Sequence, residues 1–150
     1  MSVTAADIAE VLGGQRVLGR RIRHGHDLEE LIREGVPKPA LERLVALLAE
    51  PTHGGDGRDL KAGLRNRIVS RATYQRAKRF NLQVSETTER LARLYALAAS
   101  AFADGGAAAR FMLTPHPELG DRAPFDVALT EVGGREVEEV IERGLHGLPA

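Results

Sequence analysis

The sequence contains no cysteine and no tryptophan, and aromatic residues make up only 4% of it. Without cysteine, disulfides and thiolate metal sites are excluded. The hydrophobic content of 43% is sufficient for a core, which must be built mainly from alanine, leucine, valine and isoleucine. With 150 residues, the chain suits one ordinary domain or two very small ones.

Long apolar runs are also missing. No stretch reaches the about 20 apolar residues that a membrane-spanning helix needs. The first residues, MSVTAADIAEVLGG, contain the acid Asp7 and lack the apolar run of a secretion signal. We therefore expect a soluble, cytoplasmic protein without a membrane partner.

The sequence contains no strong motif for a catalytic site or a metal site. His24 and His26 are two residues apart, but no third ligand is in view, so a surface loop is favoured over a metal site. The acids Glu138, Glu139 and Glu142 lie between apolar helix positions, as on a solvated face. We find no nucleophile beside a base and no phosphate-binding loop. We expect no enzyme activity, no metal and no cofactor.

Apolar residues recur at helical spacing along most of the chain, and no alternating run is long enough for a strand. The chain is therefore predicted to be all-α. Thr4 and Asp7 predict a capping box, and Ser70 and Ser85 are predicted N-caps. Helix stops are expected at three glycine pairs, 13–14, 105–106 and 133–134. The predicted helices are 5–12, 27–34, 40–50, 85–103, 107–113, one or two turns within 125–134, and 135–145.

Charge is distributed unevenly although 21 basic residues balance 21 acidic ones. Residues 1–80 carry 15 basic and 10 acidic residues, whereas residues 81–150 carry 6 and 11. Within residues 58–80, eight basic residues face Asp59 alone. Such a local field attracts polyanions.

The basic segment also predicts a helix-turn-helix. A short helix in DLKAGL, a turn at RNRIV and a second basic helix after Ser70 follow one another. In such a motif the second helix enters the major groove, and its N-terminal residues contact bases and phosphates. The alternative is a solvated helix face. We favour DNA, with these contacts: Arg67, Arg71, Thr73, Tyr74, Arg76, Lys78 and Arg79.

From Arg67 to the C-terminus, the order of motifs resembles the Xre/MbcA/ParS antitoxins, which are encoded beside RES-domain toxins in bacteria. No single motif is specific, but the ordered set is. Phe111, Met112 and His116 stand where the family usually has Trp, Leu and Asn. The motif residues are Thr73 with Arg76 and Lys78, Ser85-Glu86, Arg90, Arg93, Phe111-Met112, Pro115-His116, Leu119-Gly120, Arg122 and Pro124, Thr130-Glu131, Gly133 and Gly147.

This resemblance implies a two-part all-α protein without enzyme activity. Residues 1–80 would be an Xre-like helix-turn-helix domain that binds operator DNA and represses its own operon. Residues 81–150 would be a small helical domain that binds the RES-domain toxin and covers its active site. Such toxins consume NAD or use it to ADP-ribosylate a target.

The predicted toxin-binding residues lie in the last third of the chain, and they are Arg122, Glu131, Glu138, Glu142, Leu145, His146, Gly147 and Leu148. The tail LHGLPA is predicted to leave the last helix and plug the toxin's cleft. The alternative is a frayed terminus.

A homodimer is expected, because operators with two half-sites need two copies of a helix-turn-helix. The long helix 85–103 is the candidate to pair. The alternative function is a stand-alone transcription regulator whose C-terminal helical domain only dimerises.

Overall fold

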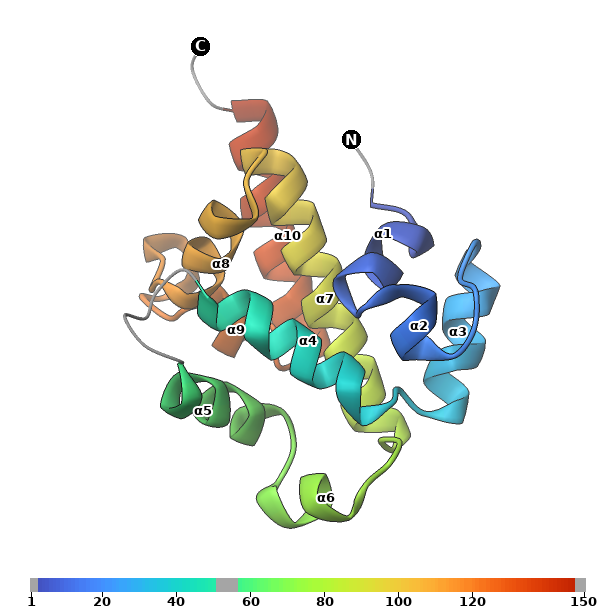
Figure 1. Cartoon of the computed structure of the whole chain (residues 1–150). Helices are drawn as coiled ribbons and strands as arrows, with labels where there is room; N and C mark the ends of the chain where they lie inside the picture. Colours follow the sequence, from blue (N-terminus) through green and yellow to red (C-terminus); the bar gives the residue numbers. More distant parts are fainter. Residues whose placement is uncertain (1–2, 51–56, 148–150) are drawn as a thin grey trace.

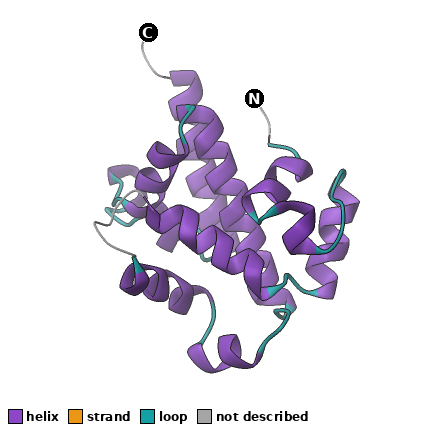
Figure 2. Cartoon of the chain, in the orientation of Figure 1, coloured by secondary structure: helices purple, strands orange, loops and turns teal. Residues whose placement is uncertain are grey.

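The computed structural model describes residues 3–50 and 57–147. This part of the chain consists of helices and connecting loops and has no strand, which confirms the all-α prediction (Figure 2). The elements are α1 (Ala5–Val11), α2 (Gly14–Leu18), α3 (Gly25–Glu34), α4 (Lys38–Ala49), α5 (Arg58–Ile68), α6 (Arg71–Arg76), α7 (Leu82–Phe102), α8 (Gly105–Leu113), the 3-10 helix η2 (Pro117–Leu119), α9 (Pro124–Val127) and α10 (Glu131–Gly147). None of these described helices has the length and apolarity of a membrane span.

Helix α7 organises the fold. It packs against α1 and α3 on one side and against α8 and α10 on the other, and it also contacts α4 and α5 (Figure 1). Leu91, Leu94 and Ala98 are completely buried along it. Burial of such apolar surface is the main stabilising term in folding.

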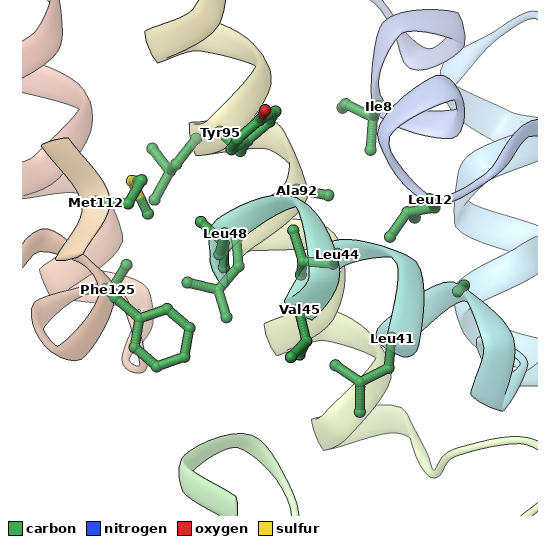
Figure 3. Close-up of a cluster of buried hydrophobic side chains, with 14 of the residues drawn as sticks. Ile8, Leu12, Leu41, Leu44, Val45, Leu48, Ala92, Tyr95, Met112 and Phe125 are labelled. Carbon is green, nitrogen blue, oxygen red and sulfur yellow. The ribbon is translucent and has the colours of Figure 1, made fainter. Parts of the chain in front are cut away.

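The core runs through the whole described structure as one cluster. Figure 3 shows side chains from α4 at its centre, between α1 on one side and the C-terminal helices on the other. The labelled members are Ile8, Leu12, Leu41, Leu44, Val45, Leu48, Ala92, Tyr95, Met112 and Phe125. Tyr95 and Phe125 are the aromatic residues among them, in agreement with the aliphatic core expected from the composition.

Two predicted helix starts are confirmed and one is wrong. The Thr4–Asp7 capping box is present, and Ser70 Oγ accepts a hydrogen bond from Thr73 N–H. Ser85 is not a cap: α7 begins four residues earlier, where Asn81 accepts from Val84 N–H at 2.9 Å. Ser85 is buried and instead accepts from Val36 N–H at 2.9 Å. A tertiary partner thus occupies the serine that local preference assigned to a cap.

The other differences concern helix lengths. Helix α3 begins at Gly25 rather than at Asp27, because the Asp27 carboxylate accepts from His24 N–H and so becomes the third helical residue. The segment RNRIV is not a turn: α5 continues through Ile68, and only Val69 and Ser70 separate it from α6. Helix α2 was not predicted.

The glycine pairs are not helix stops in two of the three cases. Gly105 opens α8 behind the Asp104 cap. Gly133 and Gly134 lie inside α10. A Cβ on Gly133 would lie 1.8 Å from Val127 O, so this glycine serves the close approach of α9 to α10. The pair 13–14 does follow the end of α1, with Gly13 at a positive φ of 107°.

Candidate functional site

Helices α5 and α6 and the segment that follows them form one edge of the molecule (lower edge of Figure 1). They carry what we call the basic surface: Arg58, Lys61, Arg65, Arg67, Arg71, Arg76, Lys78 and Arg79. Within residues 58–80 of the sequence, Asp59 is the only acid that could compensate the charge of this surface. Three of its guanidinium groups are instead held by partners inside the protein.

Glu42 on α4 holds the first of them. Its carboxylate accepts two hydrogen bonds from Arg65, at 2.7 and 3.1 Å, and a third from the Tyr74 hydroxyl. Burial opposes ionisation of Glu42, but the hydrogen bonds from Arg65 and Tyr74 outweigh it, so the pKa of Glu42 lies below its usual value. Burial, the hydrogen bond to Glu42 and the charge of Glu42 raise the pKa of Tyr74 to about 12.

The Tyr74 ring is enclosed as well as hydrogen-bonded. The Lys38 ammonium lies 4.2 Å from the ring centroid, and the Arg65 guanidinium lies 4.9 Å from it. Phe80 stacks on the ring at 6.3 Å between centroids. Tyr74, which we predicted to contact DNA, is therefore an internal anchor that joins α6 to α4 and α5.

Arg67 and Arg79 are held in the same way. Arg67 pairs with Asp126 of α9 at 2.5 Å, and its guanidinium lies over the Phe125 ring at 5.0 Å. Arg79 donates to Gly35 O at 2.8 Å. Both side chains are still partly exposed, but their charge is engaged.

The other predicted DNA contacts face outward. Arg71, Arg76 and Lys78 are exposed, and their side chains have no hydrogen-bond or ion-pair partner within the described residues. Thr73 is half-buried, and its hydroxyl accepts from Ser70. Arg71, Arg76 and Lys78 thus form the part of the basic surface that is available to a polyanion.

The C-terminal part has a second surface around an aromatic groove. This groove has a volume of about 460 Å³. Phe102 and Phe111 meet there at 5.6 Å, and His116 meets Phe111 edge-on at 6.0 Å. Arg143 and Glu118 also line the groove and form an ion pair at 2.8 Å. Phe102 is the last residue of α7, and it is 41% exposed.

A third surface feature is a groove at the start of α10, lined by Arg90, Thr130 and Glu131 among others. The Arg90 side chain is nine-tenths buried there and donates to Ala128 O at 3.1 Å. Its Nε has no hydrogen bond, and the nearest carboxylate oxygen belongs to Glu131, at 3.5 Å. Gly134 leaves the room that Arg90 occupies, since a Cβ there would lie 2.6 Å from Arg90 Cδ.

The predicted toxin-binding residues are spread over this region. Arg122, Glu131 and Glu142 are exposed, and Glu138 is half-buried. The chain does not leave the helix at Leu145 as predicted. Helix α10 continues through Gly147 and therefore includes His146. Leu148 lies outside the described residues.

Glu42, Lys38 and the aromatic groove were not predicted from the sequence. Glu42 lies 23 positions before Arg65, and nothing in the local pattern links the two. Phe102 and Phe111 were visible as two of only four phenylalanines in the chain. His24 and His26 stack on each other at 5.5 Å, and His26 lies beside Asp27.

The comparison with known families bears on the second surface. Residues 97–147 match the antitoxin Xre/MbcA/ParS C-terminal toxin-binding domain. No curated protein matches the chain. The matched segment contains every residue of the aromatic groove. It begins after Arg93, so the motif residues 73–93 lie outside it. Residues 97–147 are therefore similar to the Xre/MbcA/ParS family of antitoxin toxin-binding domains, and over that segment the match confirms the resemblance found in the sequence.

Proposed function

We propose that this protein neutralises a cognate RES-domain toxin by covering its active site, and that it represses its own operon by binding DNA. The match of residues 97–147 to an antitoxin toxin-binding domain carries the first half of the proposal. The exposed charges of α6 and the segment after it support the second half. On this proposal the protein is a regulator and catalyses nothing.

The toxin would be bound by the matched segment. The exposed acids Glu131 and Glu142 complement a cleft that holds the pyrophosphate of NAD, which favours rapid association. The aromatic groove with Phe102 supplies apolar contact area beside them. Apolar and aromatic anchors at the centre of an interface contribute most of its affinity. Residues 145–150 would then enter the cleft.

DNA would be bound by the basic surface. Arg71, Arg76 and Lys78 would hold phosphates, and such contacts supply affinity without reading sequence. Helix α5, the link of Val69 and Ser70, and α6 follow one another in the order of a helix-turn-helix. Residues 1–80 and 81–150 would act as the two functional parts, although they share one core around α7.

The homodimer also remains part of the proposal, but pairing along α7 is not supported. Most of α7 is buried within its own chain, and Leu82, Gln83, Glu86 and Phe102 are the residues with exposed side chains. A dimer would have to use its ends or another surface.

The test is coexpression with the neighbouring RES-domain gene. Cells with the toxin gene alone should lose NAD and stop growing, and the full chain should restore both. A chain without residues 145–150 should remain folded, because Val137, Val140 and Ile141 still fill the core, yet it should fail to protect. If the truncated chain protects the cells fully, the toxin is inhibited through the surface of the C-terminal helices and not through residues 145–150. If the neighbouring gene is harmless by itself, the stand-alone regulator is the better interpretation.

A further inference from the structure

Helix α6 is short, and none of its six residues is buried. Its side-chain contacts with the rest of the protein run through Tyr74, which is bonded to Glu42 and enclosed by Lys38, Arg65 and Phe80. Tyr74 therefore sets which side of α6 faces the protein.

The opposite side follows from helix geometry. Successive residues are about 100° apart around a helix of 3.6 residues per turn. With Tyr74 turned inward, Ala72 and Arg76 lie on the far side, and Gln75 lies at about a right angle to the anchor. All three are exposed. Ala72 has no side chain beyond Cβ, so the helix backbone can come close to a partner there.

Gln75 differs chemically from its neighbours in the basic surface. It is uncharged, so it adds nothing to the attraction of phosphates. Its side chain makes no hydrogen bond within the described part of the chain, so both its carbonyl and its amide are available. A glutamine in a major groove accepts from N6 of adenine and donates to N7, a bidentate pair that discriminates between bases.

We propose that Gln75 is the specificity-determining residue of α6 and reads an adenine in the operator, whereas Tyr74 positions the helix and does not contact DNA. This inference rests on the proposed DNA binding. Arg71, Arg76 and Lys78 provide affinity around Gln75, and Gln75 provides discrimination.

The test is selection of binding sites from a random double-stranded DNA library by the purified full chain and its variants. The wild type should enrich a motif with an adenine that Gln75→Ala no longer prefers. At that position a wrong base should cost the wild type about 5- to 150-fold in affinity, and the variant should tolerate it. The salt dependence of binding should not change, because no charge is lost. Gln15→Ala, an exposed glutamine on α2, is the matched control and should select the wild-type motif.

Two other outcomes separate the ways in which the inference can fail. If the wild type enriches a motif that Gln75→Ala retains in full, the inference is wrong, although DNA binding stands. If the wild type enriches no sequence and does not bind its own promoter, the DNA half of the proposed function fails, and this inference fails with it. Tyr74→Phe should keep the motif, since the ring contacts remain. A motif changed at one position by Tyr74→Phe would assign the reading to Tyr74 instead.

Discussion

Arg67 of α5 and Asp126 of α9 form an ion pair across 59 positions of the sequence. The contact joins the basic surface directly to the segment that matches a toxin-binding domain. It also removes Arg67 from the charges that are available to DNA. A side chain that was predicted from the sequence to contact DNA thus links the basic surface to the C-terminal part of the protein.

Asp126→Asn should release Arg67 and strengthen DNA binding. Arg67 would then add about one phosphate contact, so the slope of log affinity against log salt should steepen by about one. Stability should fall by no more than about 1 kcal/mol, because the pair is partly exposed. Filter binding over a salt series and urea unfolding measure the two effects. Asp121→Asn makes the same charge change at an exposed residue that forms no ion pair with the described residues. Equal slopes for the two variants would contradict the prediction.

Arg71→Ala with Arg76→Ala should weaken operator binding enough to abolish repression and should leave toxin neutralisation intact. Two phosphate contacts are lost, so the salt slope should fall by about two. Both side chains are exposed and unpaired within the described residues, so stability should change by less than about 0.5 kcal/mol. Promoter footprinting and coexpression with the toxin are the measurements. The control pair Arg16→Ala with Arg23→Ala removes the same charge elsewhere on the surface. If the variant with Arg71→Ala and Arg76→Ala still gave a normal footprint on the promoter, these two arginines would belong to a solvated helix face and would not contact DNA.

Tyr74 should titrate at unusually high pH. The chain has two tyrosines, so Tyr95→Phe isolates Tyr74. The titration of tyrosinate absorbance in this variant should have its midpoint at about 12, and Glu42→Gln should lower the midpoint toward the ordinary value of 10.0. A folded pKa above the unfolded one means that the protonated hydroxyl stabilises the fold. That contribution is complete below pH 10.0 and is lost as the pH rises through about 12. A midpoint near 10.0 in Tyr95→Phe itself would mean that the bond to Glu42 is not formed in solution.

Gly133→Ala should destabilise the protein strongly. The added Cβ would lie 1.8 Å from Val127 O, a backbone atom that cannot move without shifting α9. We expect a loss of at least about 2 kcal/mol, as for other overpacked sites. Gly144→Ala is the matched control in the same helix, because its Cβ meets nothing within 4 Å. This control should be neutral or more stable by up to about 1 kcal/mol. Thermal unfolding of both variants measures the difference. Similar unfolding midpoints would exclude the close approach of Val127 O to Gly133.

The sequence by itself determined the helical class and much of the local structure. The Thr4 and Ser70 caps were predictable because each depends on residues within three positions. The absence of alternating runs excluded strands in the same way. The antitoxin resemblance was also visible in the sequence, since it depends on the order of motifs along the chain.

The tertiary structure decided which of these local signals are used. Ser85 has the chemistry of a cap, but Val36, 49 positions away, uses its hydroxyl in the core. Gly133 has the chemistry of a helix stop, but it lies within α10, where its missing side chain leaves room for the backbone of α9. Whether Arg65 and Arg67 can bind a polyanion depends on their ion pairs with Glu42 and Asp126, which form only in the folded chain. Hydrogen bonds and ion pairs act over a few ångströms in space, so their partners can be far apart in sequence, and no local pattern records them.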